Sequence, residues 1–225
     1  AQVLEFSYDS LNRLTKKTRD DGRGTRDEVN YVYDDTAKAN CIGRLSKVID
    51  QSGSTEFFYD TLGREIKSIK TVDGIPYTVE RTYDLLDRLV TLKYPTGEVV
   101  TYGYDVNSGL LEKVTGSSAQ GTVECVKDIS YNAKGQIKTI AYGNNTSTTY
   151  TYGQDLRLSR ILTQPPMTPS TPIQDLNYVF DKNGNVTTLT DNLKSNIRSY
   201  SYDDLDRLTQ ASNVPAPGGG YATFN

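Results

Sequence analysis

Residues 83–89 read Tyr-Asp-Leu-Leu-Asp-Arg-Leu, and residues 202–208 read Tyr-Asp-Asp-Leu-Asp-Arg-Leu. The opening aromatic-Asp pair, or a close variant of it, recurs along the chain about every 24 residues. Nine copies begin at Tyr8, Tyr33, Tyr59, Tyr83, Tyr104, Tyr131, Tyr152, Phe180 and Tyr202. A fixed period of roughly 20–50 residues is typical of repeat proteins, so the sequence predicts one supersecondary unit repeated in tandem.

The residues after each aromatic predict a tight β-turn. Asp is favoured at the first position of a type I turn, and a three-residue hairpin loop then needs a residue with positive φ. The motif aspartates are Asp9, Asp34, Asp60, Asp84, Asp105, Asp181 and Asp203. In copies of regular length, the positive-φ position holds residue types that adopt it at least cost, namely Asn12, Gly63, Asp87, Gly135, Gly184 and Asp206.

Three copies depart from this pattern. The Tyr152 copy has Gly153 in place of Asp and Leu156 at the positive-φ position, so we expect its loop to differ. The Tyr33 copy carries an insertion through Cys41, and the Tyr104 copy carries one extra residue before Gly109.

Strand signals flank each turn. A second aromatic residue stands two positions before the motif aromatic in seven copies, which places both rings on one face of an extended strand. On the returning side, apolar residues fall three apart, as in Leu89/Leu92 and Ile137/Ile140. We interpret this spacing as strands with a β-bulge, or as strands buried on both faces.

A second set of turns rich in Gly, Asp and Asn lies between the motif turns. The predicted fold is therefore all-β, a continuous antiparallel meander of hairpins over residues 1–213. Residues 164–172 hold four prolines and are expected to form a long exposed loop, and residues 214–225 a flexible Pro/Gly-rich tail.

Composition excludes several classes of function. The chain has no histidine, which removes Ser-His-Asp triads, Cys-His dyads and imidazole-ligated zinc. With 25 Lys+Arg against 28 Asp+Glu, it offers no basic surface for nucleic acid or anionic lipid, and no apolar run is long enough to span a membrane. Cys41 and Cys125 match no metal-ligand spacing, and either a disulfide or two free thiols is compatible with the sequence. We expect no cofactor and no metal.

The tandem Tyr-Asp-x-x-Gly-Arg-Leu motifs, together with residues 94–105, resemble the YD repeats of the Rhs family. This family includes bacterial polymorphic toxins, the shell-forming components of insecticidal toxin complexes and animal teneurins. The resemblance implies a curved β-hairpin ribbon, an arc of a hollow spiralling shell that in the bacterial members encloses a C-terminal toxic polypeptide. The end of this sequence is expected to lack the core domain that holds the self-cleaving site of related proteins, so no catalytic residue is carried over.

Three hypotheses for function follow. The first is a structural shell segment without enzymatic activity, secreted or at the cell surface as part of a larger bacterial protein, whose partners are further repeats, a C-terminal core and a toxin cargo. In it, the motif tyrosines anchor the core, Asp and Gly build turns, and the recurring arginines, Arg13, Arg44, Arg64, Arg88 and Arg207, cover aromatic faces and pair with carboxylates. The second is an adhesion or carbohydrate-binding module, and the third an enzyme with paired carboxylates. Open sheet edges also predict self-association.

Overall fold

The computed structural model describes residues 3–22, 26–166, 171–214 and 222–224. Within these residues the chain forms nineteen strands and no helix, which confirms the all-β prediction. The strands are β1 Val3–Tyr8, β2 Leu14–Asp20, β3 Arg26–Tyr33, β4 Leu45–Asp50, β5 Gly53–Tyr59, β6 Glu65–Val72, β7 Ile75–Tyr83, β8 Leu89–Lys93, β9 Val99–Tyr104, β10 Leu111–Ser118, β11 Gly121–Tyr131, β12 Ile137–Tyr142, β13 Ser147–Tyr152, β14 Leu158–Gln164, β15 Gln174–Phe180, β16 Val186–Asp191, β17 Asn196–Tyr202, β18 Leu208–Val214 and β19 Ala222–Phe224.

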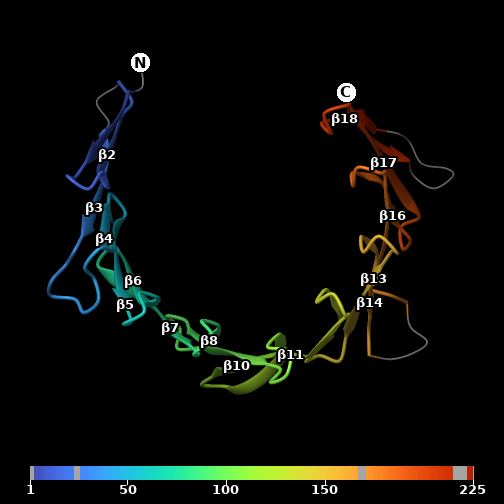
Figure 1. Ribbon diagram of the computed structural model, residues 1–225, viewed down its shortest axis with the longest axis horizontal. Helices are drawn as coiled ribbons and strands as arrows, with labels where there is room; N and C mark the ends of the chain where they lie inside the picture. The colour runs from blue at the N-terminus through green and yellow to red at the C-terminus, as the bar shows by residue number, and fades with distance from the viewer. Residues whose placement is uncertain (1–2, 23–25, 167–170, 215–221, 225) are drawn as a thin grey trace. The chain divides into compact units, whose positions relative to one another are not determined.

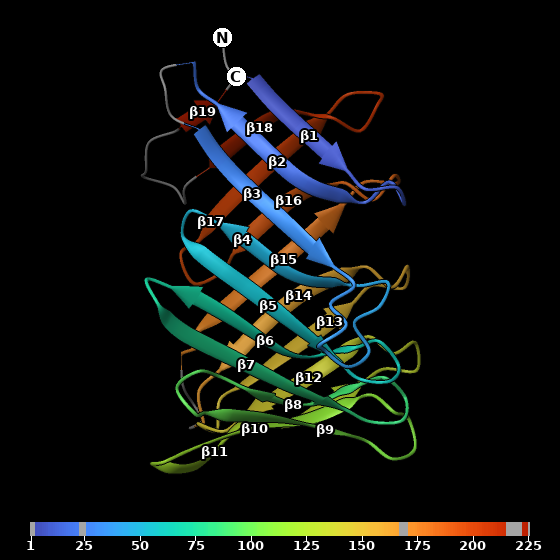
Figure 2. The same cartoon turned by 90° about the vertical axis from the view of Figure 1, so that its left-hand side faces the viewer.

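The chain divides into two compact units. Unit 1 comprises Ala1–Tyr102 and Gly116–Thr122, and unit 2 comprises Gly103–Thr115 and Val123–Asn225. In unit 1, the strands from β1 to β9 each pair antiparallel with the next strand in sequence (Figures 1 and 2). In unit 2, the strands from β11 to β19 follow the same rule. Each unit is therefore a meander of hairpins.

Alternate hairpin loops gather at the same edge of a meander. The loops that follow β1, β3, β5 and β7 lie along one edge of unit 1, and the second set of turns lies along the other (Figure 2). Each of these edges is a row of strand ends and the loops that join them, not an edge strand of the sheet. We call the row that carries the motif loops the motif edge. The repeated motif thus places its Asp, Gly and Arg residues in a row within each unit.

A β-bulge follows the motif turn in eight copies of the repeat, on the returning strand. Tyr83 pairs with Leu89 and Arg81 pairs with Leu92, so Val90 is the extra residue on the returning strand. The same shift occurs at the hairpins that end in Tyr8, Tyr33, Tyr59, Tyr131, Tyr152, Phe180 and Tyr202. Because the bulge absorbs one residue, apolar side chains three apart point to the same face. The bulge interpretation of the sequence is confirmed.

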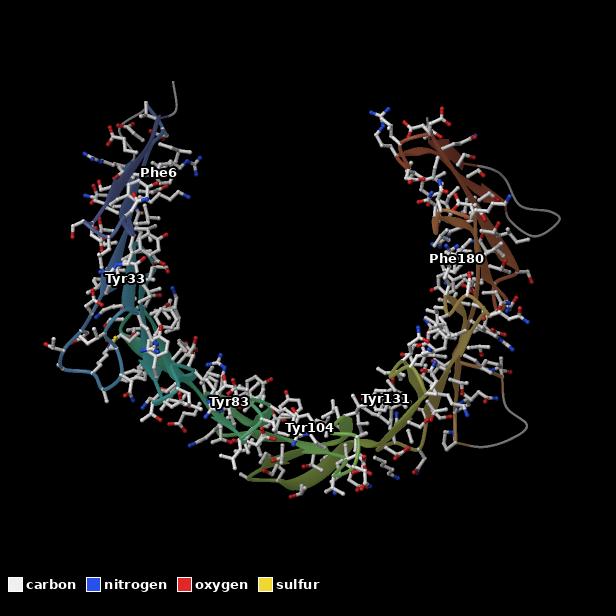
Figure 3. All side chains as sticks on the ribbon, in the orientation of Figure 1. Phe6, Tyr33, Tyr83, Tyr104, Tyr131 and Phe180 are labelled. Carbon is white, nitrogen blue, oxygen red and sulfur yellow. The ribbon has the colours of Figure 1, made fainter. Side chains whose placement is uncertain are left out.

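Each unit is one layer of sheet. In neither unit do the described residues supply a helix or a second sheet over the strands, and side chains project from both faces (Figure 3). Among the described residues, the buried apolar side chains are Cys41 and Ile129. One face is nevertheless better packed: in β3, Tyr31 and Tyr33 are half-buried, whereas Val32 between them is 42% exposed. We call the face that carries the motif aromatics the aromatic face.

The turn prediction is confirmed at every copy of regular length. Asn12, Gly63, Asp87, Gly135, Gly184 and Asp206 all have positive φ. The expectation that the Tyr152 loop differs is wrong. Leu156 adopts φ 63° there, Gly153 N–H donates to Arg157 O at 2.8 Å, and Leu156 N–H donates to Gly153 O at 3.0 Å, the same pattern as elsewhere. The flanking bulged hairpin imposes the loop on a residue that disfavours it.

Two expectations fall largely outside the described residues. The Pro-rich segment connects β14 to β15, and its residues 167–170 are among those not described. The expected tail at 214–225 includes residues 215–221 and 225, also not described, while Val214 ends β18 and Ala222–Phe224 pairs with β18 as β19. The domain boundary at residue 213 therefore stays a prediction.

Candidate functional site

The motif edge is the candidate functional site, because the recurring polar residues meet there. In the turn of Asp84, the carboxylate Oδ1 accepts the backbone N–H of Leu86 at 2.8 Å and of Arg88 at 3.0 Å. Asp84 N–H also donates to Arg88 O at 3.0 Å, which closes the loop. Asp9, Asp60 and Asp203 repeat this arrangement. A side chain that satisfies two loop N–H groups fixes the turn.

These hydrogen bonds hold the aspartates in their ionised form. The backbone N–H of Arg13 is the main cause that lowers the pKa of Asp9, and the backbone N–H of Arg207 lowers the pKa of Asp203 in the same way. At Asp84 desolvation alone would raise the pKa, but the hydrogen bonds from Arg88 and Leu86 together outweigh it and lower the pKa. A carboxylate with a lowered pKa is a poor proton donor near neutral pH, which argues against a general-acid role.

The motif arginines connect one repeat to the next. Arg13 Nε donates to Asp9 Oδ2 at 2.7 Å in its own turn, while its Nη2 binds Asp34 and its guanidinium lies 4.5 Å from the centre of the Tyr33 ring. These two groups belong to the following copy of the motif. The sequence interpretation that arginines cover aromatic faces and pair with carboxylates is confirmed here.

Arg64 makes the same connection one repeat further along. Its Nε binds Asp60 at 2.7 Å, its Nη1 binds Asp87 Oδ1 at 2.7 Å and Asp84 O at 3.0 Å, and it lies 4.9 Å from the Tyr83 ring. The Nε and Nη1 atoms of this guanidinium are therefore engaged in contacts that join neighbouring turns.

The motif tyrosines connect repeats in the opposite direction along the chain. Tyr59 Oη donates to Leu45 O at 2.7 Å, the carbonyl of the first residue of the preceding returning strand. The equivalent bonds join Tyr83 to Glu65, Tyr131 to Leu111, Tyr152 to Ile137 and Tyr202 to Val186, at 2.7 to 3.0 Å. Phe180 occupies the same position without a hydroxyl group. Each such bond ties a motif ring to the hairpin before it.

The remaining predicted site residues lie in the same loops. Asp181 Oδ1 accepts the N–H of Gly184 at 2.8 Å and of Asn185 at 2.9 Å. Asp105 accepts from Asn107 and Ser108 in the longer loop of its copy, which closes through Gly109. Arg207 pairs with Asp203, and Arg88 pairs with Asp84, each at 2.7 Å. Gly135 supplies positive φ after Asn132, so these residues all serve the loops that contain them.

Sequence reasoning missed two features of this edge. Asn132 and Gln136 replace the Asp-Arg pair: Asn132 Nδ2 donates to Gln136 Oε1 at 2.8 Å, and Gln136 Nε2 reaches Leu156 O in the next loop at 2.9 Å. The second feature is the hydroxyl residue at several bulges, where the side chain donates to a backbone carbonyl, as Thr209 does to Ser201 O at 3.0 Å. The recurring Leu-Thr and Leu-Ser pairs after the motif carry that signal in the sequence.

Other kinds of site find little support in the part of the chain that is described. Cys41 and Cys125 are free thiols, the first buried and the second exposed. No group of three potential metal ligands comes together within the described ranges. Within the described residues, no helix has the length and hydropathy that crossing a membrane requires.

Comparisons with known proteins agree with the repeat. A family model described as RHS Repeat matches residues 180–219. Toxin subunit YenC1 of Yersinia entomophaga is 32% identical over 140 residues, which cover 53% of this chain and 14% of the relative. Toxin subunit YenC2 of the same organism is 32% identical over 109 residues, which cover 42% of this chain and 11% of the relative. The chain thus spans no more than about one seventh of the length of these curated relatives.

Solved structures share the fold. The crystal structure of TcdB2-TccC3 matches with a TM-score of 0.73 and 22% identity, over 94% of this chain and 12% of that one. A structure of the Photorhabdus luminescens Tc holotoxin pore matches over the same shares with a TM-score of 0.72 and 22% identity. With the repeated motif, its bulged hairpins and the toxin-subunit relatives, these findings show that the chain is similar to proteins of the Rhs/YD-repeat family, with the family model itself matching residues 180–219.

Proposed function

We propose that this chain is a wall segment of a YD-repeat shell that encloses a polypeptide cargo, and that it has no enzymatic activity of its own. One observation carries the proposal: the recurring residues of the motif are engaged in building a repeat or in joining it to its neighbours. Asp caps the turn, Arg reaches the next turn, and the Tyr hydroxyl group reaches the previous hairpin. Recurring residues that serve mainly to join one repeat to the next are expected in a repeat protein with a structural role.

The relatives support a role in the shell of a toxin complex. The curated relatives are named as toxin subunits, and the fold is that of chains in Tc toxin structures. We therefore propose that the partners of this chain are other parts of the same polypeptide, namely further repeats, a C-terminal core and a toxic cargo. We further propose that the chain is part of a secreted or surface-exposed product.

The proposal is tested on the protein as its cell produces it. The purified protein is digested with a broad-specificity protease, and the surviving polypeptides are identified by mass spectrometry. A C-terminal polypeptide that survives digestion while bound, and is degraded once the shell is unfolded in urea, is the expected result. A C-terminal polypeptide that is digested as fast in the native as in the unfolded protein would contradict enclosure.

The alternative function, adhesion, predicts different results in protease digestion and in a glycan-array experiment. A surface adhesin would leave no protected polypeptide and would retain glycans on an array through exposed aromatic rings. Five of the motif tyrosine hydroxyl groups are already bonded to backbone carbonyls, and this leaves fewer groups for sugar recognition. A silent array together with a protected polypeptide would separate the two functions.

A further inference from the structure

The aromatic face of unit 2 is hollowed in two adjoining places. One hollow, of about 540 Å³, lies over β11 to β15 and includes Tyr142, Tyr150 and Thr148 in its lining. The other, of about 320 Å³, lies over β15 to β17 and includes Leu176 and Leu189. Gln174 lines both hollows, so they adjoin each other.

A row of paired residues crosses five strands and connects the hollows. Tyr150 pairs with Ile161, Ile161 with Leu176, Leu176 with Asp191, and Asp191 with Asn196. Residues directly opposite in antiparallel strands share a face, and Leu176 stands two positions before Tyr178, which places this row on the aromatic face. Four steps between strands span about 19 Å, close to the length of six extended residues.

The chemistry of the second hollow is amphipathic. Leu176, Leu189, Leu193 and Ile173 provide apolar surface, and Leu193 and Ile173 are 40% and 58% exposed. Two cationic side chains, Lys194 and Arg198, line the same hollow. Arg198 forms no ion pair with any residue in the described ranges, and Lys194 reaches only Asp191, at 3.9 Å with 78% of its side chain exposed.

Two polar groups complete the hollow. Asp191 is used locally, because its Oδ1 accepts the N–H of Leu193 at 3.1 Å and of Lys194 at 3.2 Å. Asn196 is one of the residues that line the hollow, and its Oδ1 is buried without a hydrogen-bond partner among the described residues. A buried acceptor without a donor is costly, so an occupant that brings an N–H group to this point would be favoured.

We infer that these hollows form a binding site for an extended polypeptide segment that carries aliphatic and acidic side chains on one face, at every second position. Aliphatic side chains of the segment pack on Leu176 and Leu189, a backbone N–H donates to Asn196 Oδ1, and carboxylates reach Lys194 and Arg198. An extended chain is the occupant that supplies these three groups at a spacing of a few ångströms. The inference rests on the proposed function only for the source of the segment, which is the enclosed cargo.

The test measures peptide binding to the full 225-residue chain. The probe is a fluorescein-labelled eight-residue peptide, here called the Leu-Glu peptide, in which Leu and Glu alternate at the odd positions and Ser fills the even positions, so that an extended conformation places Leu and Glu on one face. Its binding is followed by fluorescence anisotropy. Two comparison peptides replace every Glu by Lys or every Leu by Ser. Binding of the Leu-Glu peptide, at least about tenfold tighter than either comparison peptide, is expected from the combined charge and apolar match. Equal binding of the three peptides, or none, would overturn the inference.

Charge reversal locates the site. The double variant Lys194→Glu and Arg198→Glu is expected to weaken binding about tenfold. The matched control, Lys134→Glu with Lys182→Glu, changes net charge equally at the motif edge and should leave the affinity within about twofold, since long-range attraction is screened by salt. Equal losses in both variants would reduce the effect to net charge and contradict the site.

A third variant tests the buried acceptor. Asn196→Leu removes Oδ1 and is expected to weaken the Leu-Glu peptide several-fold without loss of the far-ultraviolet circular dichroism spectrum. An unchanged affinity would remove Asn196 from the site. Displacement of the peptide by a neutral oligosaccharide such as maltohexaose would assign the hollows to a glycan instead. These assays use only this chain, so their outcome is independent of the proposed function. Peptide binding can fail while the cargo of the natural protein is protected, and peptide binding can succeed while no cargo is protected.

Discussion

The tyrosine hydroxyl bonds between repeats can be tested by deleting one oxygen atom. Tyr59→Phe removes the hydroxyl group that donates to Leu45 O at 2.7 Å and keeps the ring. The side chain is half-buried, so water only partly replaces the lost donor. Desolvation raises the pKa of Tyr59, which keeps the phenol protonated as a donor throughout the neutral range.

The expected loss follows from the net value of one hydrogen bond. An intramolecular hydrogen bond contributes about 1 kcal/mol to stability, with a range of roughly 0.5–1.5 kcal/mol. For a urea dependence of about 2 kcal/mol per M, Tyr59→Phe should lower the unfolding midpoint of unit 1 by about 0.5 M. The slope should not change, because the substitution leaves the buried surface almost the same.

The measurement is equilibrium urea unfolding, with hydrogen exchange and mass spectrometry to assign the transition to peptides that contain residues 45–59. Phe180→Tyr is the reciprocal variant, because Phe180 occupies the same motif position and the pattern places Leu158 O as its acceptor. It should raise the midpoint of unit 2 by a similar amount. If Tyr59→Phe leaves the midpoint unchanged, the hydroxyl bonds do not couple neighbouring repeats.

Three further predictions concern the turns and pH. Asp84→Ala with Asp203→Ala should lower the thermal midpoint because each removes an acceptor for two loop N–H groups, whereas Asn at both positions should restore most of it; equal midpoints for the Ala and Asn pairs would contradict the capping role. Leu156→Asn should stabilise unit 2 by about 1 kcal/mol in urea unfolding, since φ 63° strains Leu and suits Asn; a destabilised variant would mean that the Leu side chain contributes more than the strain costs. Because the motif aspartates have lowered pKa values in the folded state, the stability they add is present above about pH 4 and is lost as pH falls further; urea midpoints measured from pH 2 to pH 7 should fall only in the acid range, and a flat profile would refute it.

The hairpin repeat could be predicted from the sequence because residues close together in the chain determine it. Asp at the start of the loop and Gly, Asn or Asp three positions later specify the turn, and the three-residue spacing of Leu89 and Leu92 indicates a β-bulge or a strand buried on both faces. The Tyr152 loop was predicted wrongly because a rule for single residues was applied without its neighbours. There the bulged hairpin, with Asp155 Oδ1 accepting Arg157 N–H at 3.2 Å, holds Leu156 in a conformation it disfavours alone.

The contacts between repeats were less accessible to prediction. The sequence predicts that the motif arginines pair with carboxylates, but it does not identify the partner of each one. The partners of Arg64 depend on how far its guanidinium extends to the next loop, which the spacing of the motifs does not specify. The same holds for the Tyr59 hydroxyl group and Leu45 O, whose 14-residue separation changes from repeat to repeat. Gln136 was missed because it departs from the motif while it keeps the same bridging role.

The central claim is that these repeats wall off a polypeptide. A cryo-electron microscopy reconstruction of the natural protein tests it most directly, because it places residues 3–214 relative to everything else in the molecule. We predict that the strands form a wall with polypeptide density against the aromatic face of unit 2 and solvent on the other face. Solvent on both faces, with no enclosed density, would contradict the claim.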